Sequence, residues 1–490
     1  MWAEPLYTAA EMRAAEEEYE GPTLELMERA GSATAEAILH RYGEARAAAV
    51  YCGAGANGGD GFVVARKLHE AGRTVAVRLV GDESKIAGDA SENLRRAREA
   101  GVGFTEHPDP ELVVDAIFGT GFSGKPQREA AHAIEGANAA GAPVVAVDVP
   151  SGVDASSGEA AGPAIRADLT VTFHAPKVGL AIAPGRFYAG EVVVADIGLA
   201  RRAETEHRRV TAEILERVPR RGPRDNKYTA GSVLVVGGSA GKTGAATLAA
   251  EASLRAGAGI CTACVPASLA AIFEERLVEV MTRSCVDEDG VMTMDAADVI
   301  LEAAERAGAV ALGPGLGRTD GTRALVGYLL DRLDKPIALD ADGLWAIGGH
   351  LDWVFARDRP TVLTPHEGEL ARLLGRKSEW VQARRLHAVQ GGADDVGAVV
   401  LLKGADTIVA APRRGVLVSD LGDPGLATAG AGDVLTGIVA AFLSKGMEPR
   451  LAAAAAAVAQ GAASRVAAER HGSAGLLARD VIEALSPALS

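Results

Sequence analysis

The sequence predicts an α/β protein of two domains, each built around a mostly parallel, doubly wound β-sheet. Short apolar segments of strand length alternate with longer helical segments through both halves of the chain. Small or polar residues follow most of these strands, as they do at the ligand-binding ends of such sheets. A charged, irregular stretch over 198–226 separates the halves. We therefore expect one domain at 1–218 and a second at 219–490.

Composition restricts the class of protein. The 490 residues are 48% apolar and 23% charged, which is typical of a globular chain. A formal net charge of −15 argues against general binding to nucleic acid or to an anionic membrane, so we expect neither partner. No basic and apolar leader opens the chain, and no apolar run approaches the ~20 residues that span a bilayer, so we expect a cytoplasmic protein.

The four cysteines are too few for a disulfide framework. Cys261 and Cys264 fit a CxxC pattern, but they lie in a segment that is typical of a strand. A spacing of three places their side chains on opposite faces of that strand, which disfavours a redox or zinc site.

The first half begins with a β-loop-α-β unit. Its expected elements are two helices within 8–42, a strand at 47–52, a helix at 62–71 and a strand at 74–80. The loop after the first strand formally contains the dinucleotide-binding pattern GxGxxG. Arg78 stands where that pattern requires an acid, and Asp60 would face the pyrophosphate. A dehydrogenase-type site is therefore disfavoured.

Polar residues gather where the strands of this half end. Further strands are expected at 112–118, 143–149 and 169–173, with helices around 88–100 and 126–140. The polar residues at the ends of the strands are Asn57, Asp60, Asp115, Asp148, Ser151 and Asp154. Their hard oxygen atoms suit an alkali or alkaline-earth cation. Each acid alone could simply cap a turn, but three converging strand ends favour a site.

Four motifs in this half resemble the NAD(P)H-hydrate epimerase domain. They are Asn57-Gly58-Gly59-Asp60-Gly61, Asp115-Ala116-Ile117-Phe118-Gly119, Asp148-Val149-Pro150-Ser151-Gly152-Val153-Asp154 and Ala175-Pro176-Lys177-Val178-Gly179. That family interconverts the R and S forms of NAD(P)H that carries water across its nicotinamide ring. The resemblance implies a potassium ion held by Asn57, Asp115 and Ser151.

The same resemblance implies a pocket for the hydrate. Its residues would be Ala56, Asn57, Gly58, Gly59, Asp60, Gly119, Thr120, Gly121, Phe122, Ser123, Gly124, Lys125 and Asp148. Epimerisation at a hydrated carbon requires proton movement, for which Asp148 is the first candidate and Lys177 the second. Ala56 departs from the usual family residue, asparagine, so one hydrogen bond to the ligand is in question.

The stretch between the halves contains the basic run Arg201-Arg202-Ala203-Glu204-Thr205-Glu206-His207-Arg208-Arg209. Such a run could bind RNA. In an acidic protein it is more typical of a solvated linker, which is the interpretation we adopt.

The second half opens with a segment that is almost a P-loop, Gly237-Gly238-Ser239-Ala240-Gly241-Lys242-Thr243. A P-loop needs four residues between its first glycine and Gly-Lys-[Ser/Thr], and only three separate Gly237 from Gly241. We therefore reject a P-loop but keep the strand before this segment and the helix after it. Further strands are expected at 310–312, 336–339, 361–363 and 399–402.

Late in the chain, Gly430-Ala431-Gly432-Asp433 opens an apolar helix. Small residues let backbone N–H groups converge on an anion, and the positive end of the helix dipole strengthens the attraction, so a phosphate would fit here. Asp433 would repel that phosphate unless it takes a proton from a neighbouring hydroxyl. Taken alone, it could equally be a helix cap.

The motifs of the second half resemble the NAD(P)H-hydrate dehydratase branch of the ribokinase-like fold, an α/β/α sandwich, while the first half is expected to be Rossmann-like. The motifs include Gly313-Pro314-Gly315-Leu316-Gly317, Asp340-Ala341-Asp342-Gly343 and Thr364-Pro365-His366-Glu367-Gly368-Glu369. The resemblance implies that Ala245, Gly315, His366 and Asp433 contact the hydrate. It also implies that an adenine nucleotide contacts Lys403, Gly404, Ala405, Asp406, Thr407 and Gly432. On its own, His366 would more often be structural.

The chemistry implied by the resemblance is metabolite repair. Hydroxide is a poor leaving group, so phosphorylation of the C6 hydroxyl would allow it to leave as phosphate, with Asp433 as the base. Backbone N–H groups at 430–432 would stabilise the transferred phosphoryl group. We expect ADP as co-substrate, giving AMP and phosphate, with Mg²⁺ beside it, and a homo-oligomer. Ala431 and Asn226 depart from the family pattern, where threonine and histidine are usual.

Two other functions remain open from the sequence. A kinase for a sugar or hydroxymethylpyrimidine would use the same fold and an equivalent aspartate. The first domain could also be a binding or scaffold module without activity, although Asn57, Asp115, Asp148 and Ser151 are all present. The choice between ADP and ATP is also open.

Overall fold

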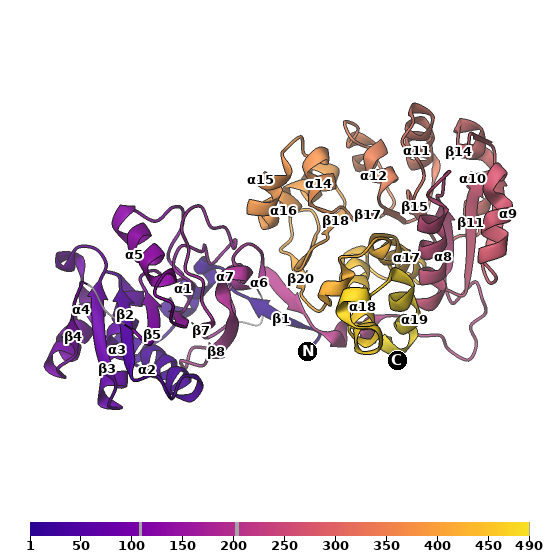
Figure 1. Ribbon diagram of the computed structural model, residues 1–490. Coiled ribbons are helices and arrows are strands. Elements are labelled where there is room, and N and C mark those ends of the chain that lie inside the picture. Colours follow the sequence, from indigo (N-terminus) through magenta and orange to yellow (C-terminus); the bar gives the residue numbers. More distant parts are fainter. Residues whose placement is uncertain (107–109, 201–204, 490) are drawn as a thin grey trace. The chain divides into compact units, whose positions relative to one another are not determined.

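The computed structural model describes residues 1–106, 110–200 and 205–489 (Figure 1). The chain forms two compact units. The N-terminal unit is Pro5–His207 with Ala383–Leu386, and the C-terminal unit is Met1–Glu4, Arg208–Gln382 and His387–Ser490. Each contains a large parallel or mostly parallel sheet, so the predicted α/β class is confirmed. Part of the expected linker, 201–204, lies outside the described residues.

The N-terminal unit is built on a seven-stranded sheet in which all the described pairs are parallel. In sheet order the strands are β4 (Gly103–Phe104), β3 (Thr74–Leu79), β2 (Ala47–Cys52), β5 (Leu112–Ala116), β6 (Val144–Val147), β7 (Leu169–Phe173) and β8 (Glu191–Ala195). The chain moves outward from β2 to β3 and β4, then returns to the other side of β2 at β5. The switch point between β2 and β5 is where such sheets leave a crevice for ligands.

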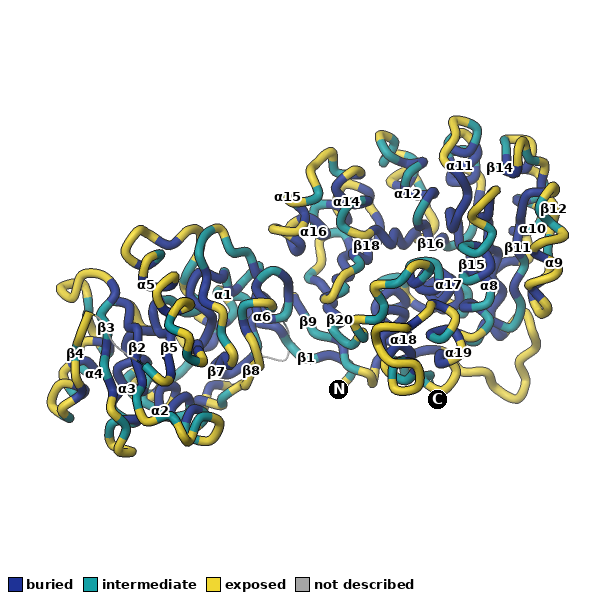
Figure 2. The backbone as a smooth tube through the Cα atoms, viewed as in Figure 1, coloured by how far each residue is buried: buried dark blue, intermediate teal, exposed yellow. Residues whose placement is uncertain are grey.

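Both faces of this sheet are buried, because successive strand residues point to opposite sides. In β2, Val50 and Cys52 join a core cluster with residues of α2, α3 and α4, whereas Ala49 and Tyr51 join a separate cluster with α5. The helices are α1 (Ala9–Glu17), α2 (Thr23–Arg41), α3 (Ala56–Glu70), α4 (Gly88–Glu99), α5 (Arg128–Asn138), α6 (Val178–Ala181) and α7 (Arg186–Ala189). Figure 2 shows the buried sheet strands beneath helices with partly exposed outer faces.

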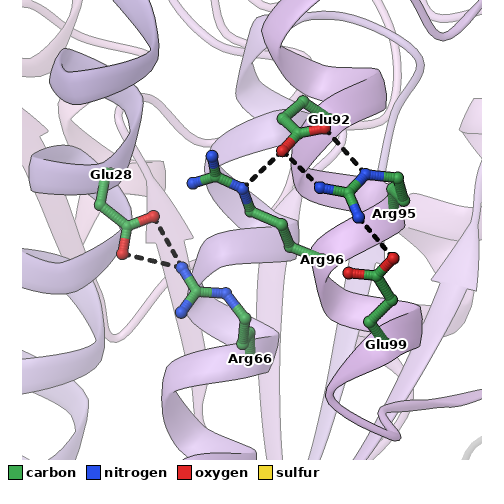
Figure 3. A network of polar contacts seen from close by, with 6 residues as sticks. All are labelled: Glu28, Arg66, Glu92, Arg95, Arg96 and Glu99. Carbon is green, nitrogen blue, oxygen red and sulfur yellow. Dashed lines mark hydrogen bonds and ion pairs between the residues drawn. The ribbon is translucent and has the colours of Figure 1, made fainter.

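Ion pairs lie on the outer surfaces of these helices, between α2 and α3 and along α4 (Figure 3). Arg66 of α3 donates to both oxygens of Glu28 on α2, at 2.8 and 2.6 Å. On α4, Glu92 accepts from Arg95 at 2.7 Å and from Arg96 at 2.8 Å. The second group is solvent-exposed, so we expect only a small contribution to stability from it.

The C-terminal unit is built on an eleven-stranded sheet. In sheet order its strands are β1 (Ala3–Leu6), β9 (His207–Val210), β20 (Leu417–Ser419), β19 (Thr407–Ala410), β18 (Val399–Leu402), β17 (Thr361–Leu363), β16 (Ile337–Leu339), β15 (Ala309–Leu312), β10 (Ser232–Val236), β11 (Ile260–Pro266) and β12 (Met281–Cys285). The strands from β12 to β18 are parallel, and β19 is antiparallel to both its neighbours. A separate hairpin pairs β13 (Asp287–Glu288) with β14 (Val291–Met292). The chain reverses direction across the sheet between β10 and β15, which creates a second switch point.

The remaining helices belong mainly to this sheet. They are α8 (Thr243–Arg255), α9 (Ala270–Arg276), α10 (Ala297–Ala304), α11 (Asp320–Arg332), α12 (Asp342–Ala346), α13 (Asp352–Phe355), α14 (Glu367–Leu373), α15 (Ser378–Ala383), α16 (Arg385–Val396), α17 (Ala431–Ser444), α18 (Pro449–His471) and α19 (Ala478–Ala488). Helices α8, α17, α18 and α19 form one core with alternate residues of the strands, such as Val233 and Val235.

Small residues make this core tight. A Cβ added to Gly437 of α17 would lie 2.2 Å from the carbonyl oxygen of Ala249 on α8, so the two helices touch through their backbones. Helix α18 is alanine-rich, and it is long and apolar enough by composition to cross a membrane, contrary to the expectation from the sequence. However, 72% of its most apolar window is buried inside the unit, so it is a core helix.

The first residues of the chain belong to the C-terminal unit. Ala3 is fully buried with Val210 and Ile214, and Glu4 accepts from Nε of Arg209 at 3.1 Å. The boundary predicted between 218 and 219 lies after β9 and after a 3₁₀ helix, η2 (Ala212–Arg217), whose Ile214 is in the same core. Sequence patterns did not indicate this strand pairing, because β1 and β9 are far apart in the chain.

Candidate active sites

A cavity of about 950 Å³ opens at the switch point of the N-terminal sheet. Loops after β2, β3, β5 and β6 line it, together with residues of α1. The predicted pocket residues that line it are Ala56, Asn57, Asp60, Gly119, Thr120, Gly121, Phe122, Ser123 and Asp148. Gly58, Gly59, Gly124 and Lys125 are not among the lining residues. Gly58 and Gly59 instead allow close packing, because a Cβ on either would meet Gly53 or Met27 at under 3 Å.

The start of α3 is the main local departure from the predicted elements. The helix was expected from 62, but it begins at Ala56, so Asn57 and Asp60 lie in its first two turns rather than in a loop. Four N–H groups at a helix start have no partner within the helix. The cavity therefore meets the positive end of α3 as well as its polar side chains.

Asp148 lies at the end of β6 with a backbone φ of 65°, a conformation that aspartate tolerates better than most residues. One carboxylate oxygen accepts from the Thr120 amide at 2.8 Å, and the other lies 3.0 Å from Nζ of Lys177. Burial raises the pKa of Asp148, but the Lys177 ammonium and the bonds from Thr120 outweigh burial and lower it. The group is therefore an anion that faces the cavity.

Lys177 is fully buried behind Asp148 and does not line the cavity. Its ammonium donates to the Thr172 hydroxyl at 2.8 Å and to the Phe173 carbonyl at 2.7 Å, and it pairs with Asp148. An ammonium has three hydrogens, and these three contacts account for them.

Two further acids line the cavity, and both hold their protons more tightly than usual. Burial, followed by the nearby Asp148 carboxylate, raises the pKa of Asp60 well above its ordinary value. The same two causes raise the pKa of Glu16, which comes from α1. The cavity thus combines an ionised carboxylate with groups that favour the protonated form, which is the arrangement that acid–base catalysis needs.

Asp115 and Ser151 lie together below the cavity. The Ser151 hydroxyl donates to Asp115 at 2.6 Å and accepts from the Phe118 amide at 2.8 Å. Burial raises the pKa of Asp115 to about 6 despite these bonds. Asn57 is also buried, and neither polar atom of its amide has a hydrogen-bond partner among the residues that the structure describes. These oxygens suit a potassium ion chemically, and a cation would satisfy the Asn57 oxygen.

In the C-terminal unit, Asp433 lies in the first turn of α17 and is partly buried. Gly430 supplies the left-handed backbone that starts this helix, with φ 89°. Burial, followed by the Asp340 carboxylate, raises the pKa of Asp433 to about 7, although Lys403 opposes the rise. Asp433 is therefore an acid poised to exchange a proton near neutral pH.

Asp340 organises the surroundings of Asp433 from the end of β16. It accepts from the Thr436 hydroxyl at 2.7 Å and from Nζ of Lys403 at 3.0 Å. Lys403 also lies 3.8 Å from a carboxylate oxygen of Glu369. A Cβ on Gly432 would lie 3.2 Å from Nζ of Lys403, so the helix start, the lysine and the acids share one small region.

The other predicted residues of this unit fall into two places along the strand ends. Ala245 and Gly315 are adjacent, because a Cβ on Gly315 would lie 3.0 Å from that of Ala245. Gly404 and Ala405 are exposed in the turn between β18 and β19, and Asp406 is buried there. Ala245 and Gly315 thus lie across β16 and β17 from the turn that follows β18.

His366 caps α14, and its side chain is 61% exposed. Its Nδ1 accepts from the Gly368 amide at 3.0 Å, and its own amide donates to Glu369 at 2.9 Å. One ring nitrogen is used by the cap, and the other, Nε2, lies 3.6 Å from a carboxylate oxygen of Glu369.

Several polar residues of these sites could not be singled out from the sequence. Glu16 lies on α1, far from the other cavity residues in the chain. Lys242, from the segment rejected as a P-loop, donates to Asp342 at 2.9 Å, and Arg318 donates to the same carboxylate at 2.6 Å. The sequence shows Asp340 and Asp342 as acids that follow a strand. Only the parallel pairing of the strands places Asp340 near Asp433 and Asp342 near Lys242.

Comparison with known proteins identifies both units. A family model described as NAD(P)H-hydrate dehydratase matches residues 233–487, and one described as YjeF-related protein N-terminus matches 23–179. The chain is 42% identical to the bifunctional NAD(P)H-hydrate repair enzyme Nnr of Moorella thermoacetica, over 98% of this chain and 96% of that protein. It is 37% identical to the enzyme of the same name from Escherichia coli K12, over 94% and 88%.

A solved ribokinase-like superfamily protein from Enterococcus faecalis V583 is 23% identical, with a TM-score of 0.50. It covers 59% of this chain, and 98% of its own chain is matched. This likeness confirms the predicted ribokinase-like fold of the C-terminal unit.

Proposed function

The chain belongs to the family of bifunctional NAD(P)H-hydrate repair enzymes, and from this premise we propose how its own residues carry out the two reactions. The N-terminal unit interconverts the R and S epimers of hydrated NAD(P)H. The C-terminal unit removes water from the S epimer at the expense of ADP, giving NAD(P)H, AMP and phosphate. The two activities together return both epimers to the cofactor. We place this activity in the cytoplasm, and we propose that the chain acts as a homo-oligomer.

For dehydration, the observation that carries the proposal is Asp433, with its pKa raised to about 7, at the start of α17. Its carboxylate takes the proton from the C6 hydroxyl while that oxygen attacks the terminal phosphorus of ADP, and AMP leaves. The backbone N–H groups of 430–432 and the helix dipole stabilise charge on the phosphoryl group. Phosphate then leaves C6, a proton leaves C5, and the ring double bond reforms.

Lys403 and Asp340 support this step. The two groups hold each other at 3.0 Å, and Thr436 fixes the second oxygen of Asp340. Lys403 is therefore placed to meet a phosphate oxygen of the nucleotide. The described residues contain no group of three or more His, Cys, Asp or Glu that could hold a metal, so Mg²⁺ would be held mainly by the phosphates. When bound, Mg²⁺ would neutralise phosphate charge.

For epimerisation, we assign Asp148 as the base and Asp60 as the acid. Asp148 takes the proton of the C6 hydroxyl, the C6–N1 bond breaks to give an aldehyde, and Asp60 protonates N1. Closure on the other face of the aldehyde reverses both proton transfers and inverts C6. The proposal is supported by the opposite pKa shifts of the two acids on one cavity. Lys177 acts here as a positioning residue that keeps Asp148 ionised.

Asn57, Asp115 and Ser151 are the residues that would hold potassium. The amide of Asn57 is buried without a partner, and Asp115 and Ser151 supply further oxygens. When bound, the ion would add positive charge beneath the cavity.

The dehydration proposal is tested by the products formed from S-hydrate and ADP. We expect NADH, AMP and inorganic phosphate in equal amounts. A stable phosphorylated hydrate would instead indicate a kinase, and recovery of NADH without consumption of a nucleotide would exclude the phosphoryl-transfer step. A parallel assay with ATP decides which nucleotide is preferred.

A further inference from the structure

We propose that Lys242, Arg318 and Arg372 form a subsite for the pyrophosphate of the hydrated dinucleotide in the C-terminal unit. This inference rests on the proposed dehydratase function and assigns the part of the substrate that lies away from the reacting ring. The three cations come from three separate segments of the chain, namely the loop before α8, the loop after β15, and α14.

Lys242 follows β10 and Arg318 follows β15, so both lie at the switch point of the sheet, where ligands of doubly wound proteins bind. A Cβ on Gly315 would lie 2.6 Å from the Lys242 carbonyl oxygen and 3.0 Å from the Ala245 Cβ. The cations therefore border the pair Ala245 and Gly315, which we assign to the hydrated ring.

Arg318 retains hydrogen-bonding capacity for a ligand. Its Nε donates to Asp342 at 2.6 Å, and its side chain is 51% exposed. The two terminal amino groups of this guanidinium make no hydrogen bond to the described residues. Asp342 thus holds the Arg318 side chain through Nε and leaves the N–H groups of the two terminal nitrogens available to a ligand. Such a fork fits two oxygens of a phosphate.

The Asp342 carboxylate is shared by Lys242, at 2.9 Å, and Arg318, so two cations meet one anion. Arg372 is exposed nearby and has no hydrogen bond or ion pair to the described part of the chain. Partial burial and then the Arg318 guanidinium lower the pKa of Arg372, although Glu369 and Asp342 oppose this. The cluster therefore has surplus positive charge in a protein whose net charge is −15.

The cluster is separate from the residues that we propose to hold the ADP phosphates. The proposed nucleotide residues lie at the ends of β18 and α17, where Lys403 is already placed beside Gly432. Lys242 and Arg318 follow β10 and β15, across β16 and β17 from that place, and Arg372 comes from α14, which follows β17. In the hydrated dinucleotide, the dianionic pyrophosphate follows the nicotinamide ribose. Its negative charge complements the three cations, and its place next to the ribose agrees with their place beside Ala245 and Gly315.

The test compares two hydrates as substrates, with ADP held in excess. Hydrated NADH carries the pyrophosphate, whereas hydrated reduced nicotinamide riboside carries no phosphate. We expect Arg318→Gln and Arg372→Gln each to raise KM for hydrated NADH by roughly tenfold or more, because each variant loses a charge-assisted hydrogen bond to the pyrophosphate. KM for the riboside hydrate and for ADP should stay within about twofold of the wild-type values.

Arg332→Gln is the matched control. Arg332 lies at the end of α11, pairs with Asp331 at 3.0 Å, lies over the Tyr328 ring, and is 59% exposed, so its loss removes the same charge elsewhere. It should change none of the three KM values. Thermal unfolding of each variant shows whether the fold is intact.

Two outcomes would overturn the subsite. An equal loss with both hydrates would mean that the cations only support the fold around Asp342. A rise in KM for ADP alone would assign them to the nucleotide. Failure of the proposed function itself looks different, because the wild type would then dehydrate neither hydrate.

Discussion

The pKa of Asp433 is raised to about 7, first by burial and then by Asp340. If Asp433 is the base, kcat/KM for dehydration should rise with pH and reach half its maximum near pH 7, as the carboxylate forms. Asp433→Asn should lower the rate by roughly 10²–10⁴-fold while the protein still binds ADP. Steady-state rates across the pH range check this. A profile without the limb near pH 7, or a nearly normal rate for the variant, would contradict it.

The raised pKa of Asp433 also makes the stability of the fold depend on pH. An unfolded aspartate has a pKa of about 3.9, so between about pH 4 and pH 7 the folded state retains a proton that the unfolded chain has lost. Stability therefore falls as pH rises through this window. Asp433→Asn removes the effect, so the variant should unfold at a higher temperature than the wild type. We expect the gain to grow up to about pH 7 and then stay constant, as measured by calorimetry.

Lys177 should act through the pKa of Asp148. In Lys177→Met the ammonium 3.0 Å from Asp148 is lost, so the pKa of that carboxyl should rise. Epimerisation should then fall steeply at acidic pH and recover as pH rises. The rates of R-to-S conversion for the wild type and the variant, measured across pH, test this. An equal loss at every pH would indicate a structural role or direct proton transfer by Lys177.

At the scale of elements, the active-site helix α17 is positioned by its contact with α8. A Cβ on Gly437 would lie 2.2 Å from the Ala249 carbonyl oxygen, so Gly437→Ala should force the helices apart and cost about 1–3 kcal/mol. Gly244→Ala is the control, because a Cβ on Gly244 has no atom within 4 Å. Denaturant unfolding should separate the two variants. Equal stability would show that the helix contact is not tight.

Sequence patterns predicted the central strands well and the edges poorly. Segments such as 47–52, 169–173 and 361–363 were found with the expected bounds, because fully buried parallel strands are short, continuous apolar runs. β1, β9 and β20 were missed, since they are short and pair with distant parts of the chain. The start of α3 was placed too late because glycines in its first turns are typical of a loop.

In the two sites, sequence patterns predicted the residues of local motifs but not the contacts between distant segments. Motifs adjacent in sequence located Asp148, Asp433 and the loops around them, since parallel strands bring their carboxyl ends to one edge. The contacts that tune these acids join residues distant in the chain, such as Asp340 with Lys403 and Asp342 with Arg318. A periodic pattern contains no information about such pairs. Register and burial, which only the fold supplies, determine them.

At the scale of the whole molecule, residues 1–4 belong to the C-terminal unit although they begin the chain. Deleting them removes Ala3 from the core and Glu4 from Arg209. The C-terminal unit should then unfold at a lower temperature, and dehydration should be lost earlier on heating than in the wild type. Epimerisation should survive the same heating. Parallel loss of both activities would contradict the division of the chain into these two units.

The central claim is that one aspartate base in each unit, Asp148 and Asp433, is needed to return both epimers to the same cofactor. The most direct test follows the absorbance of NADH when an equal mixture of R- and S-hydrate is incubated with ADP. The wild type should recover the whole mixture. Asp148→Asn should recover the S half at the normal rate and then slow to the spontaneous rate of epimerisation, while Asp433→Asn should recover almost none. Complete rapid recovery by either variant would contradict the account.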